Sequence, residues 1–469
     1  MSLHQPSIGE PNFDIDSIGP LVSRLRASFD QGHTRSFEWR QQQLKQLIKM
    51  LSERGDDFVE ALAADFGKPA LEARAADVGQ AKIEAQGALR NLKKWMRPER
   101  VGLPIPLMGA SRIVHDPLGC VLIIAPWNYP VGLLLAPAAG AIAAGNTMVL
   151  KPSEVTPHTS AALARFIPEY LDPEAIAVVE GGVGETTALL DERFDHIMYT
   201  GNGRVGTVVM AAAAKHLTPV TLELGGKSPC IVDRGVDLEI SARRIAWGKF
   251  INAGQTCIAP DYILVHEDVE SELIEAIQKV VVEFYGDAPK QSDDYARVVN
   301  QRHHQRLAAL LKDEEVVFGG EVDEEDCYIA PTLLRNVSPD SAVMEDEIFG
   351  PILPVLKIKD VDQAIDFVNA REKPLALYLF TNDSATEAKV LERTSSGGAC
   401  VNGTVVHISD ARLPFGGVGP SGMGAYHGRH TFETFSHRKA VMKRGMSFDI
   451  KLMYPPYTER MQKMAKRFL

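Results

Sequence analysis

Cys257 lies in the segment NAGQTCIAP, a polar, glycine-containing stretch between a predicted helix and the apolar run DYILV. A thiolate is a strong nucleophile toward a carbonyl carbon once its pKa is lowered, and a constrained loop permits this better than a packed core does. Most cysteines are small buried hydrophobes. We interpret Cys120 and Cys230, which lie inside apolar strand patterns, in that way. Cys257 is the candidate nucleophile.

Three further polar side chains could assist such chemistry. Asn128 interrupts an apolar run in APWNYP, where its amide either satisfies a local turn or donates to a developing oxyanion. Glu223 in LELGGK and Glu347 in EDEIFGP each lie beside a glycine turn at the end of an apolar stretch. A carboxylate there can act as a base or bind a ribose, although surface glutamates are common. None of the three decides a function alone.

Residues 201–206, GNGRVG, follow the strand-like HIMY and precede an alanine-rich helical pattern. This context suits a glycine turn that binds phosphate at a helix N-terminus, but such glycines also serve tight backbone geometry alone. The acidic ribose partner usually comes about 20 residues later, and Glu223 occupies that position. Both interpretations remain open at this point.

Lys151 and Glu154, in KPSE, close the apolar strand TMVL. In doubly wound sheets, ligands bind at the carboxyl ends of strands, where a lysine can hold a ribose or phosphate and a glutamate can accept from ribose hydroxyls. Alternatively, Ser153 and Glu154 cap the following helix. The motif alone does not separate the two.

The composition excludes several classes of function. The 469 residues include 50 Lys and Arg against 61 Asp and Glu, a net charge of −11, which disfavours nucleic acid as a partner and favours small molecules. The five cysteines contain no C-x-x-C pair, and no histidines have zinc-ligand spacing, so we expect no metal. The absence of a secretory signal and of a disulfide framework predicts a reducing, cytoplasmic location.

Short apolar runs alternate with helical patterns through most of the chain, which predicts an α/β fold with doubly wound parallel sheets. Residues 16–65 and 68–97 have the spacing of long amphipathic helices. Residues 117–150 contain no charged side chain, but several prolines and Asn128 interrupt them. We therefore predict a strand, a helix and a strand in a buried sheet there, and no membrane span.

Seven motifs, taken in order, resemble the aldehyde dehydrogenase superfamily. They are PWNYP, KPSE, YTGNGRVG, LELGGKSP, NAGQTCIAPDY, EIFGPILPV and PFGGVGPSGMGAYHGRHTFETFSH. The resemblance runs from about residue 15 to residue 454 and is strongest to the class 3 branch, including bacterial coniferyl aldehyde dehydrogenases. It implies NAD(P)-dependent oxidation of an aldehyde, aromatic such as coniferyl aldehyde or medium-chain aliphatic, to the carboxylic acid.

The resemblance also implies a role for each candidate. Cys257 forms a thiohemiacetal and then a thioester, the Asn128 amide and the Cys257 backbone N–H hold the oxyanion, and Glu223 activates water for hydrolysis. Glu347 holds the nicotinamide ribose or assists as a base. Glu223 is thus a base rather than the ribose ligand that the spacing rule suggests.

The cofactor positions implied in the same way lie in five segments. They are Trp127, Lys151, Glu154, Gly201, Asn202, Gly203, Gly206, Leu224, Glu347 and Phe349. A carboxylate at 154 disfavours a 2′-phosphate, so the expected cofactor is NAD, with NADP possible. Many family members carry Ser and Thr where this chain has Asn202 and Gly203. Class 3 usage accounts for the asparagine but not for the glycine.

The implied architecture has three parts. Residues 1–99 and 116–224 form a Rossmann-like cofactor-binding domain, residues 225–415 a second α/β catalytic domain, and residues 100–115 and 416–469 a small β oligomerisation arm and C-terminal tail. A homodimer is expected. Two alternatives remain: an enzyme that transfers the acyl group to coenzyme A or phosphate, which Glu223 disfavours, and a non-enzymatic, crystallin-like protein.

Overall fold

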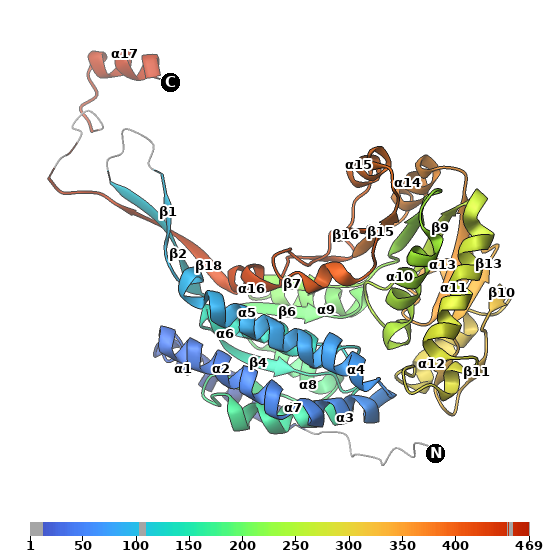
Figure 1. Ribbon diagram of the computed structural model, residues 1–469. Coiled ribbons are helices and arrows are strands. Elements are labelled where there is room, and N and C mark those ends of the chain that lie inside the picture. The colour runs from blue at the N-terminus through green and yellow to red at the C-terminus, as the bar shows by residue number, and fades with distance from the viewer. Residues whose placement is uncertain (1–12, 103–108, 448, 450–453, 469) are drawn as a thin grey trace.

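Two lobes, each built on a mostly parallel sheet, lie side by side, and an antiparallel arm projects from the first lobe (Figure 1). The computed structural model describes residues 13–102, 109–447, 449 and 454–468. The chain therefore has the α/β fold with parallel, Rossmann-like sheets that the sequence predicts. The division into domains at the predicted boundaries stays a prediction.

The first lobe contains a six-stranded sheet in the order β17-β7-β6-β3-β4-β5. Its strands are β3 (Cys120–Ile124), β4 (Thr147–Lys151), β5 (Ile176–Val178), β6 (His196–Thr200), β7 (Val220–Glu223) and β17 (Gly422–Met423). All neighbours are parallel except β17, which runs antiparallel to β7. The chain passes from β3 to β4 and β5 on one side, and then returns to place β6 on the other. The carboxyl ends of β3 and β6 thus border the crevice in which such sheets bind ligands.

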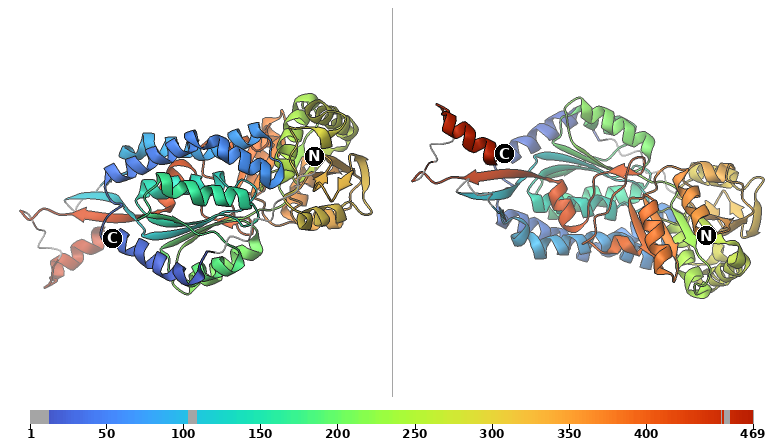
Figure 2. Two further views of the ribbon diagram at one scale, coloured as in Figure 1. Left: turned by 90° about the horizontal axis from the view of Figure 1, so that it is seen from below. Right: turned by 90° about the horizontal axis from the view of Figure 1, so that it is seen from above.

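Helices cover both faces of this sheet (Figure 2). The helical elements of the lobe are η1 (Ile15–Ser17), α1 (Ile18–Asp30), α2 (Phe37–Glu53), α3 (Gly55–Phe66), α4 (Ala70–Glu72), η2 (Ala73–Val78), α5 (Gly79–Trp95), α6 (Gly132–Ala144), α7 (Pro157–Tyr170), α8 (Val183–Asp191), α9 (Gly203–Ala214) and α16 (Gly428–Thr434). Helices α1, α8 and α9 share one apolar cluster with the sheet, while α2, α5, α6 and α7 share the other. Successive strand residues point to opposite faces, so the sheet is buried on both sides.

The uncharged segment 117–150 forms β3, α6 and β4, as its composition predicts. Helix α6 is almost entirely buried because α5 and α16 pack against it. Gly140 makes the second contact possible, since a β-carbon there would lie 2.2 Å from Cγ2 of Thr431. Among the residues that the structure describes, no helix combines the length and apolar character needed to cross a bilayer.

The second lobe contains a seven-stranded sheet in the order β10-β13-β14-β9-β8-β15-β16. Its strands are β8 (Pro229–Val232), β9 (Tyr262–His266), β10 (Glu315–Phe318), β13 (Thr332–Arg335), β14 (Ile352–Ile358), β15 (Ala376–Phe380) and β16 (Gly398–Val401), and a separate pair is formed by β11 (Val322–Asp323) and β12 (Tyr328–Ile329). Its helices are α10 (Leu238–Phe250), η3 (Ile251–Gly254), η4 (Glu267–Val269), α11 (Glu270–Tyr285), η5 (Pro289–Gln291), α12 (Gln301–Ala309), α13 (Ala342–Glu345), α14 (Val361–Asn369), α15 (Ser384–Arg393) and η6 (Val406–Ser409). Helices α10 and α11 pack on one face, and α12, α14 and α15 on the other.

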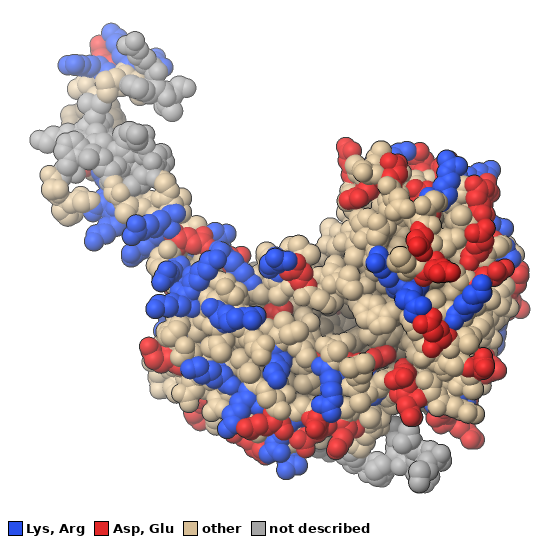
Figure 3. All heavy atoms as spheres, in the orientation of Figure 1, with Lys and Arg blue, Asp and Glu red and all other residues tan. Residues whose placement is uncertain are grey.

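The arm consists of β1 (Glu99–Val101), β2 (Ala110–Pro117) and β18 (Ser436–Lys443), followed by α17 (Glu459–Phe468). Strand β2 pairs antiparallel with β1 and, along its whole length, with β18. This agrees with a strand or hairpin in residues 100–115, of which 103–108 lie outside the described residues. Lys and Arg gather along the arm in Figure 3, and β18 contributes three of them. Strand β17 and α16, although within residues 416–469, pack on the first lobe.

Candidate active site

The predicted polar residues of the first lobe lie along one edge of its sheet. Asn128 follows β3, Lys151 ends β4, Gly201 follows β6 and Glu223 ends β7. These four strands are neighbours, and the residues after parallel strands meet at the same edge. The crevice at the strand-order reversal is therefore lined by side chains from segments far apart in the sequence.

Cys257 lies on a tight connection between α10 and β9. Asn252, Ala253 and Gly254 adopt left-handed φ angles of 56°, 51° and 74° in succession. Two of these are not glycine, and such backbone strain is common at functional sites. A β-carbon at Gly254 would lie 2.2 Å from the Gly350 carbonyl oxygen. The connection is thus pressed against the loop that carries Glu347 and Phe349.

The amide of Asn128 reaches the cysteine connection directly. Its Nδ2 donates to the Gln255 carbonyl oxygen at 3.0 Å, two residues before Cys257. Asn252 Nδ2 donates to the same oxygen at 3.0 Å and to the Asn128 carbonyl at 3.1 Å. Next to them, the Tyr129 hydroxyl lies 2.7 Å from the Thr256 hydroxyl. Asn128 is 2% exposed, so these bonds set the position of its amide.

The buried ion pair of Lys68 and Asp77 supports the turn that contains Asn128. Lys68 Nζ lies 3.2 Å from Asp77 Oδ2, and both side chains are fully buried. The same Nζ donates to the Asn128 carbonyl at 2.9 Å, and Asp77 Oδ1 accepts from the Gly132 N–H at 2.6 Å. Burial lowers the pKa of Lys68 and raises that of Asp77, with their mutual attraction opposing both shifts.

Glu223 is a buried carboxylate without a hydrogen-bond partner in the described structure. Its backbone is held between Thr200 of β6 and Gly422 of β17. Burial raises the pKa of the Glu223 carboxyl well above its ordinary value, because nothing nearby compensates the charged form. A carboxylate of this kind readily accepts a proton.

Glu347 lies beside the glycines that follow Glu223. A β-carbon at Gly225 would stand 1.9 Å from Glu347 Oε2. Burial and the charge of Asp261 raise the pKa of Glu347 to about 8, although the Gly226 N–H and the Lys227 and Lys249 ammonium groups favour its charged form.

The two lysines near Glu347 differ in their partners. Lys227 forms a 2.6 Å ion pair with Asp261. Lys249 is fully buried and its Nζ has no hydrogen-bond partner among the described residues. Burial lowers the pKa of Lys249 to about 8. Two carboxylates and a second ammonium group therefore surround a buried lysine that sequence reasoning did not single out.

The thiol of Cys257 is partly buried. A constrained loop permits a lowered pKa, but the surroundings of this thiol act in the opposite direction. Burial, and then the negative charges of Glu347 and Glu223, raise the pKa of the thiol, while the backbone N–H groups of Cys257 and Ile258 oppose the shift. The carboxylates of Glu347 and Glu223 are therefore close enough to Cys257 for their charges to act on its sulfur. Proton removal by a neighbouring base is therefore needed at neutral pH.

Trp127 and Phe349 form an edge-to-face pair with ring centroids 5.3 Å apart. Phe349 has a φ of 50°, which is unusual for an aromatic residue. His303 of α12 contacts the other side of Trp127 at 5.2 Å. An aromatic surface thus borders the crevice on the side of the 347–350 loop.

Ser153 and Glu154 are not helix caps. Helix α7 begins at Pro157 after Thr156, and Ser153 Oγ instead accepts from the Val155 N–H at 3.2 Å. Lys151 is 2% exposed and its Nζ lies 3.7 Å from the exposed carboxylate of Glu154. The capping alternative is therefore wrong, and a polar pair remains at the carboxyl end of β4.

The glycine turn 201–206 opens α9 as predicted. Asn202 is the N-cap residue and its Oδ1 accepts from the Val205 N–H at 3.0 Å. Gly206 packs on Leu224, since a β-carbon there would lie 2.9 Å from Leu224 Cδ2. A β-carbon at Gly203 would meet nothing within 4 Å, so the helix N-terminus faces open space. An open N-terminus, a buried lysine and an apolar wall fit a dinucleotide.

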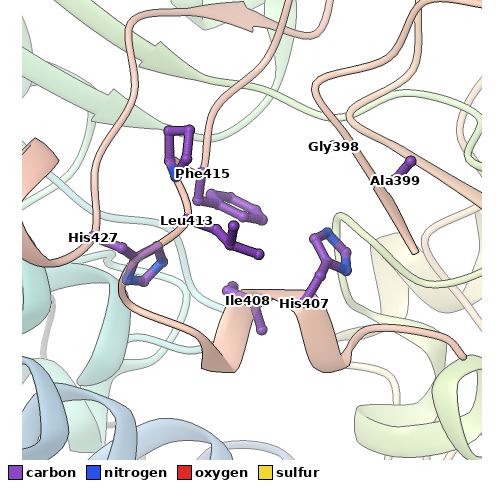
Figure 4. A pocket seen from close by; sticks show the side chains of 8 residues that line it. Gly398, Ala399, His407, Ile408, Leu413, Phe415 and His427 are labelled. Carbon is purple, nitrogen blue, oxygen red and sulfur yellow. The ribbon is translucent and has the colours of Figure 1, made fainter. Parts of the chain in front are cut away.

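A cavity of about 200 Å³ lies near the lobe junction (Figure 4). It is lined by Gly398, Ala399, His407, Ile408, Leu413, Pro414, Phe415 and His427. His407 contacts the Tyr378 ring, whose hydroxyl donates to the carbonyl of Ile258, next to Cys257. On the other side, His427 stacks on Tyr426 at 4.1 Å. Burial raises the pKa of Tyr426, and the charges of Glu223 and Cys257 add to the shift. Tyr378 thus contacts both a cavity residue and the residue that follows Cys257.

The family model of the aldehyde dehydrogenase family matches residues 14–441. The chain belongs to the aldehyde dehydrogenase family. It is 49% identical over 452 residues to mouse aldehyde dehydrogenase family 3 member A2, covering 96% of this chain and 93% of the relative. It is 48% identical over 450 residues to the rat dimeric NADP-preferring aldehyde dehydrogenase, covering 95% and 99%. The expected class 3 branch is therefore confirmed.

A solved structure agrees with this assignment. Staphylococcus aureus AldH in a substrate-bound state superposes with a TM-score of 0.94 at 44% identity, covering 96% of this chain and 99% of that one. This aldehyde dehydrogenase is thus an oxidoreductase that oxidises aldehydes, and its family uses NAD(P) as the hydride acceptor.

Several buried groups of the aldehyde dehydrogenase site escape sequence reasoning. Lys68 and Asp77 lie some 50–60 residues before Asn128 and carry no motif, and Glu84 pairs with His427 from an amphipathic helix. Lys249 stands among apolar residues in WGKF, which is the only local signal of burial.

In the described part of the chain, Glu99, His115 and Glu433 approach within 4.8 Å of one another. The Arg429 guanidinium already contacts both carboxylates there.

Proposed function

We propose that Cys257 is the nucleophile of this aldehyde dehydrogenase. The proposal rests on the meeting of three polar side chains at this cysteine. The Asn128 amide donates a hydrogen bond to the Gln255 carbonyl, two residues before Cys257, and the charges of Glu223 and Glu347 both act on the thiol. An amide NH₂ has two hydrogens. One is engaged by Gln255, and the second is available, with the Cys257 N–H, for the oxygen of an attacked aldehyde.

The thiol must first lose its proton. Glu223 lies within electrostatic range of the sulfur, has no hydrogen-bond partner among the described residues and has a raised pKa, which makes it a suitable acceptor. As the proton passes to Glu223, the sulfur bonds to the carbonyl carbon and the carbonyl oxygen becomes the oxyanion held by the Asn128 amide. The product is a thiohemiacetal on Cys257.

NAD(P), when held by the residues of the sheet edge, would supply the hydride acceptor that turns this carbon into a thioester carbonyl. In our proposal Glu223 first releases the thiol proton to solvent and then takes a proton from water. The resulting hydroxide adds to the thioester carbon, and the carbon–sulfur bond breaks to release the carboxylic acid and the Cys257 thiolate. Glu347 lies against Gly225, at the end of the cofactor crevice, and we assign it to the nicotinamide ribose.

The cofactor positions follow the sheet edge. We propose that Lys151 and Glu154 bind the adenosine ribose, that the N-terminus of α9 with Gly201, Asn202 and Gly203 faces the pyrophosphate, and that Leu224, Trp127 and Phe349 pack on the rings. Gly206 lets α9 approach Leu224.

Because the Glu154 carboxylate would repel a 2′-phosphate, NAD is the expected cofactor. A rat relative is named NADP-preferring. Comparing kcat/KM for NAD and NADP in wild type and Glu154→Gln tests this, with NADP expected to improve in the variant.

We further propose that the body of the aldehyde occupies the cavity beside Phe415. Its apolar side chains, and its position behind Tyr378 and Tyr426, suit an aromatic aldehyde such as coniferyl aldehyde or a medium-chain aliphatic aldehyde. Kinetics with both series decide between the two classes.

Two properties of the whole molecule complete the proposal. A relative is named dimeric, and the edge strand β18 of the arm presents an exposed face, so we propose a homodimer, to be tested by light scattering. We also propose a cytoplasmic location, which the five unpaired cysteines favour.

The experiment that tests the mechanism replaces the sulfur. Cys257→Ala should reduce aldehyde-dependent NADH formation at least 10³-fold, whereas Cys327→Ala, a partly buried cysteine elsewhere, should leave it unchanged. Retained activity in Cys257→Ala would refute the proposal. Product analysis with and without coenzyme A separates hydrolysis from acyl transfer, and we expect free acid in both, because Glu223 is present.

A further inference from the structure

The cavity is lined by His427, whose ring orientation is fixed by a hydrogen bond to Glu84. His427 is 2% exposed, and its Nδ1 lies 2.7 Å from Glu84 Oε1. The second oxygen of Glu84 accepts from the Gly428 N–H at 2.9 Å. Both carboxylate oxygens are therefore engaged by consecutive residues, and Glu84, itself 4% exposed, holds the imidazole against the cavity.

This arrangement determines what the other ring nitrogen can do. A carboxylate oxygen accepts only, so Nδ1 of His427 carries the hydrogen in their contact. In the neutral imidazole, Nε2 then has a free lone pair and is an acceptor. Among the described residues Nε2 has no hydrogen-bond partner. A buried acceptor in this position is unsatisfied until a ligand supplies a donor.

The rest of the lining specifies the body of that ligand. Phe415 lies edge-to-face with the His427 ring at 5.5 Å and stacks with His407 at 6.2 Å, and Ile408 and Leu413 line the same cavity (Figure 4). Burial lowers the pKa of His407 to about 4. Rings and aliphatic groups around the unpaired ring nitrogens of His427 and His407 favour a flat apolar body that bears a hydroxyl.

We propose that the His427–Glu84 pair selects aldehydes that carry a hydrogen-bond donor, namely hydroxylated aromatic aldehydes. The inference rests on the proposed function, because it requires the cavity to hold the aldehyde body. His427 contacts the substrate hydroxyl, and Glu84 acts through His427 as a positioning residue. A site built to accept a hydrogen bond discriminates against an analogue that lacks the donor, because the buried acceptor then stays unpaired.

The wild-type enzyme is tested first with cinnamaldehyde, 4-hydroxycinnamaldehyde and 4-methoxycinnamaldehyde. The hydroxyl and methoxy groups both donate electrons to the ring, but only the hydroxyl donates a hydrogen bond. We expect kcat/KM for the hydroxy compound to exceed that for the methoxy compound by about 10-fold or more. Equal values would overturn the inference while leaving aldehyde oxidation through Cys257 intact. Oxidation of none of the three would refute the proposed function as well.

Glu84→Gln gives a sharper test because it moves the imidazole hydrogen of His427 from Nδ1 to Nε2. The Gly428 N–H needs an acceptor, so the Gln oxygen faces Gly428 and its NH₂ faces His427 Nδ1. Nδ1 must then accept, which moves the hydrogen to Nε2 and turns it into a donor. The hydroxy-to-methoxy ratio should fall to about 1 or below. An unchanged ratio contradicts the proposal.

Two further variants make the result independent of folding defects. His427→Asn replaces the ring with a shorter side chain that no longer reaches the position of Nε2, and it should also abolish the discrimination. His437→Asn, at an exposed position on β18, is the matched control and should keep the wild-type ratio. Melting temperatures identify any variant that has not folded, and the wild-type comparison decides the question without either variant.

Discussion

Glu347 lies directly against Gly225, so that a β-carbon at position 225 would stand 1.9 Å from Oε2 of the carboxylate. The two residues are 122 positions apart and belong to the two loops on either side of the crevice. The lack of a side chain at 225 therefore allows the carboxylate to reach its position beside the glycines that follow Glu223.

Gly225→Ala should displace Glu347 and lower kcat/KM by about 10²-fold, because a shift of about 1 Å in a positioned group has effects of this size. Overpacking should also lower the free energy of unfolding by about 1–3 kcal/mol. Gly87→Ala in α5 is the control, since a β-carbon at that position would meet nothing within 4 Å, and it should be no less stable than wild type. Steady-state kinetics and denaturant unfolding measure both effects. Wild-type kinetics in Gly225→Ala would contradict the assignment of Glu347.

Glu223→Gln should lower kcat by about 10²–10⁴-fold at pH 7, the usual range for loss of a general base. The raised pKa of the Cys257 thiol makes this loss pH-dependent, because the thiol must then ionise without a neighbouring acceptor. Activity should therefore recover partly as pH rises toward 10. Rate profiles from pH 6 to 10 measure the recovery, with the exposed Glu239→Gln as control. A flat loss across this range would mean that Glu223 is not the proton acceptor.

Glu347 should also give the stability of the protein a measurable pH dependence. Burial and Asp261 raise its pKa from 4.5 to about 8. Between these values the folded protein retains a proton that the unfolded chain has released, so the free energy of unfolding falls as pH rises through the window. Lys227 and Lys249, which face the carboxyl, moderate the shift without reversing it.

Glu347→Gln removes this dependence, and the melting temperature of the variant should rise relative to wild type between pH 5 and pH 8. Glu223 is present in both proteins, so its own contribution cancels in the comparison. The exposed Glu345→Gln should instead follow the wild-type curve. Parallel curves for wild type and Glu347→Gln would show that the carboxyl titrates normally. Thermal unfolding at four pH values is sufficient.

Much of this enzyme could be predicted from local patterns. The apolar runs of β3, β4 and β6 indicate buried parallel strands, and residues after such strands meet at one edge. The glycine turn 201–206 could be recognised because it lies between an apolar strand pattern and a helical pattern. What patterns could not predict is the electrostatic environment, since the pKa of Cys257 depends on two carboxylates brought in from loops 34 and 90 residues away. Lys68, Asp77 and Glu84 likewise gain their roles only through tertiary contacts.

The buried pair of Lys68 and Asp77 provides the last prediction. Lys68→Met leaves Asp77 as an uncompensated buried carboxylate, which should lower the free energy of unfolding by about 3–5 kcal/mol. It also removes the donor to the Asn128 carbonyl, so kcat should fall through a misplaced amide. The exposed Lys215, paired with Asp191, is the matched control, and its substitution by Met should change little.

A double variant separates the two effects of this pair. Lys68→Met with Asp77→Leu removes both charges and should be more stable than Lys68→Met alone, because no unpaired buried charge remains. The Asn128 carbonyl and the Gly132 N–H still lack their partners, so kcat should stay low even where stability returns. Recovery of kcat together with stability would show that the pair only supports the fold and does not position Asn128. Unfolding curves and kcat for wild type, Lys68→Met, Asp77→Leu and the double variant give the complete cycle.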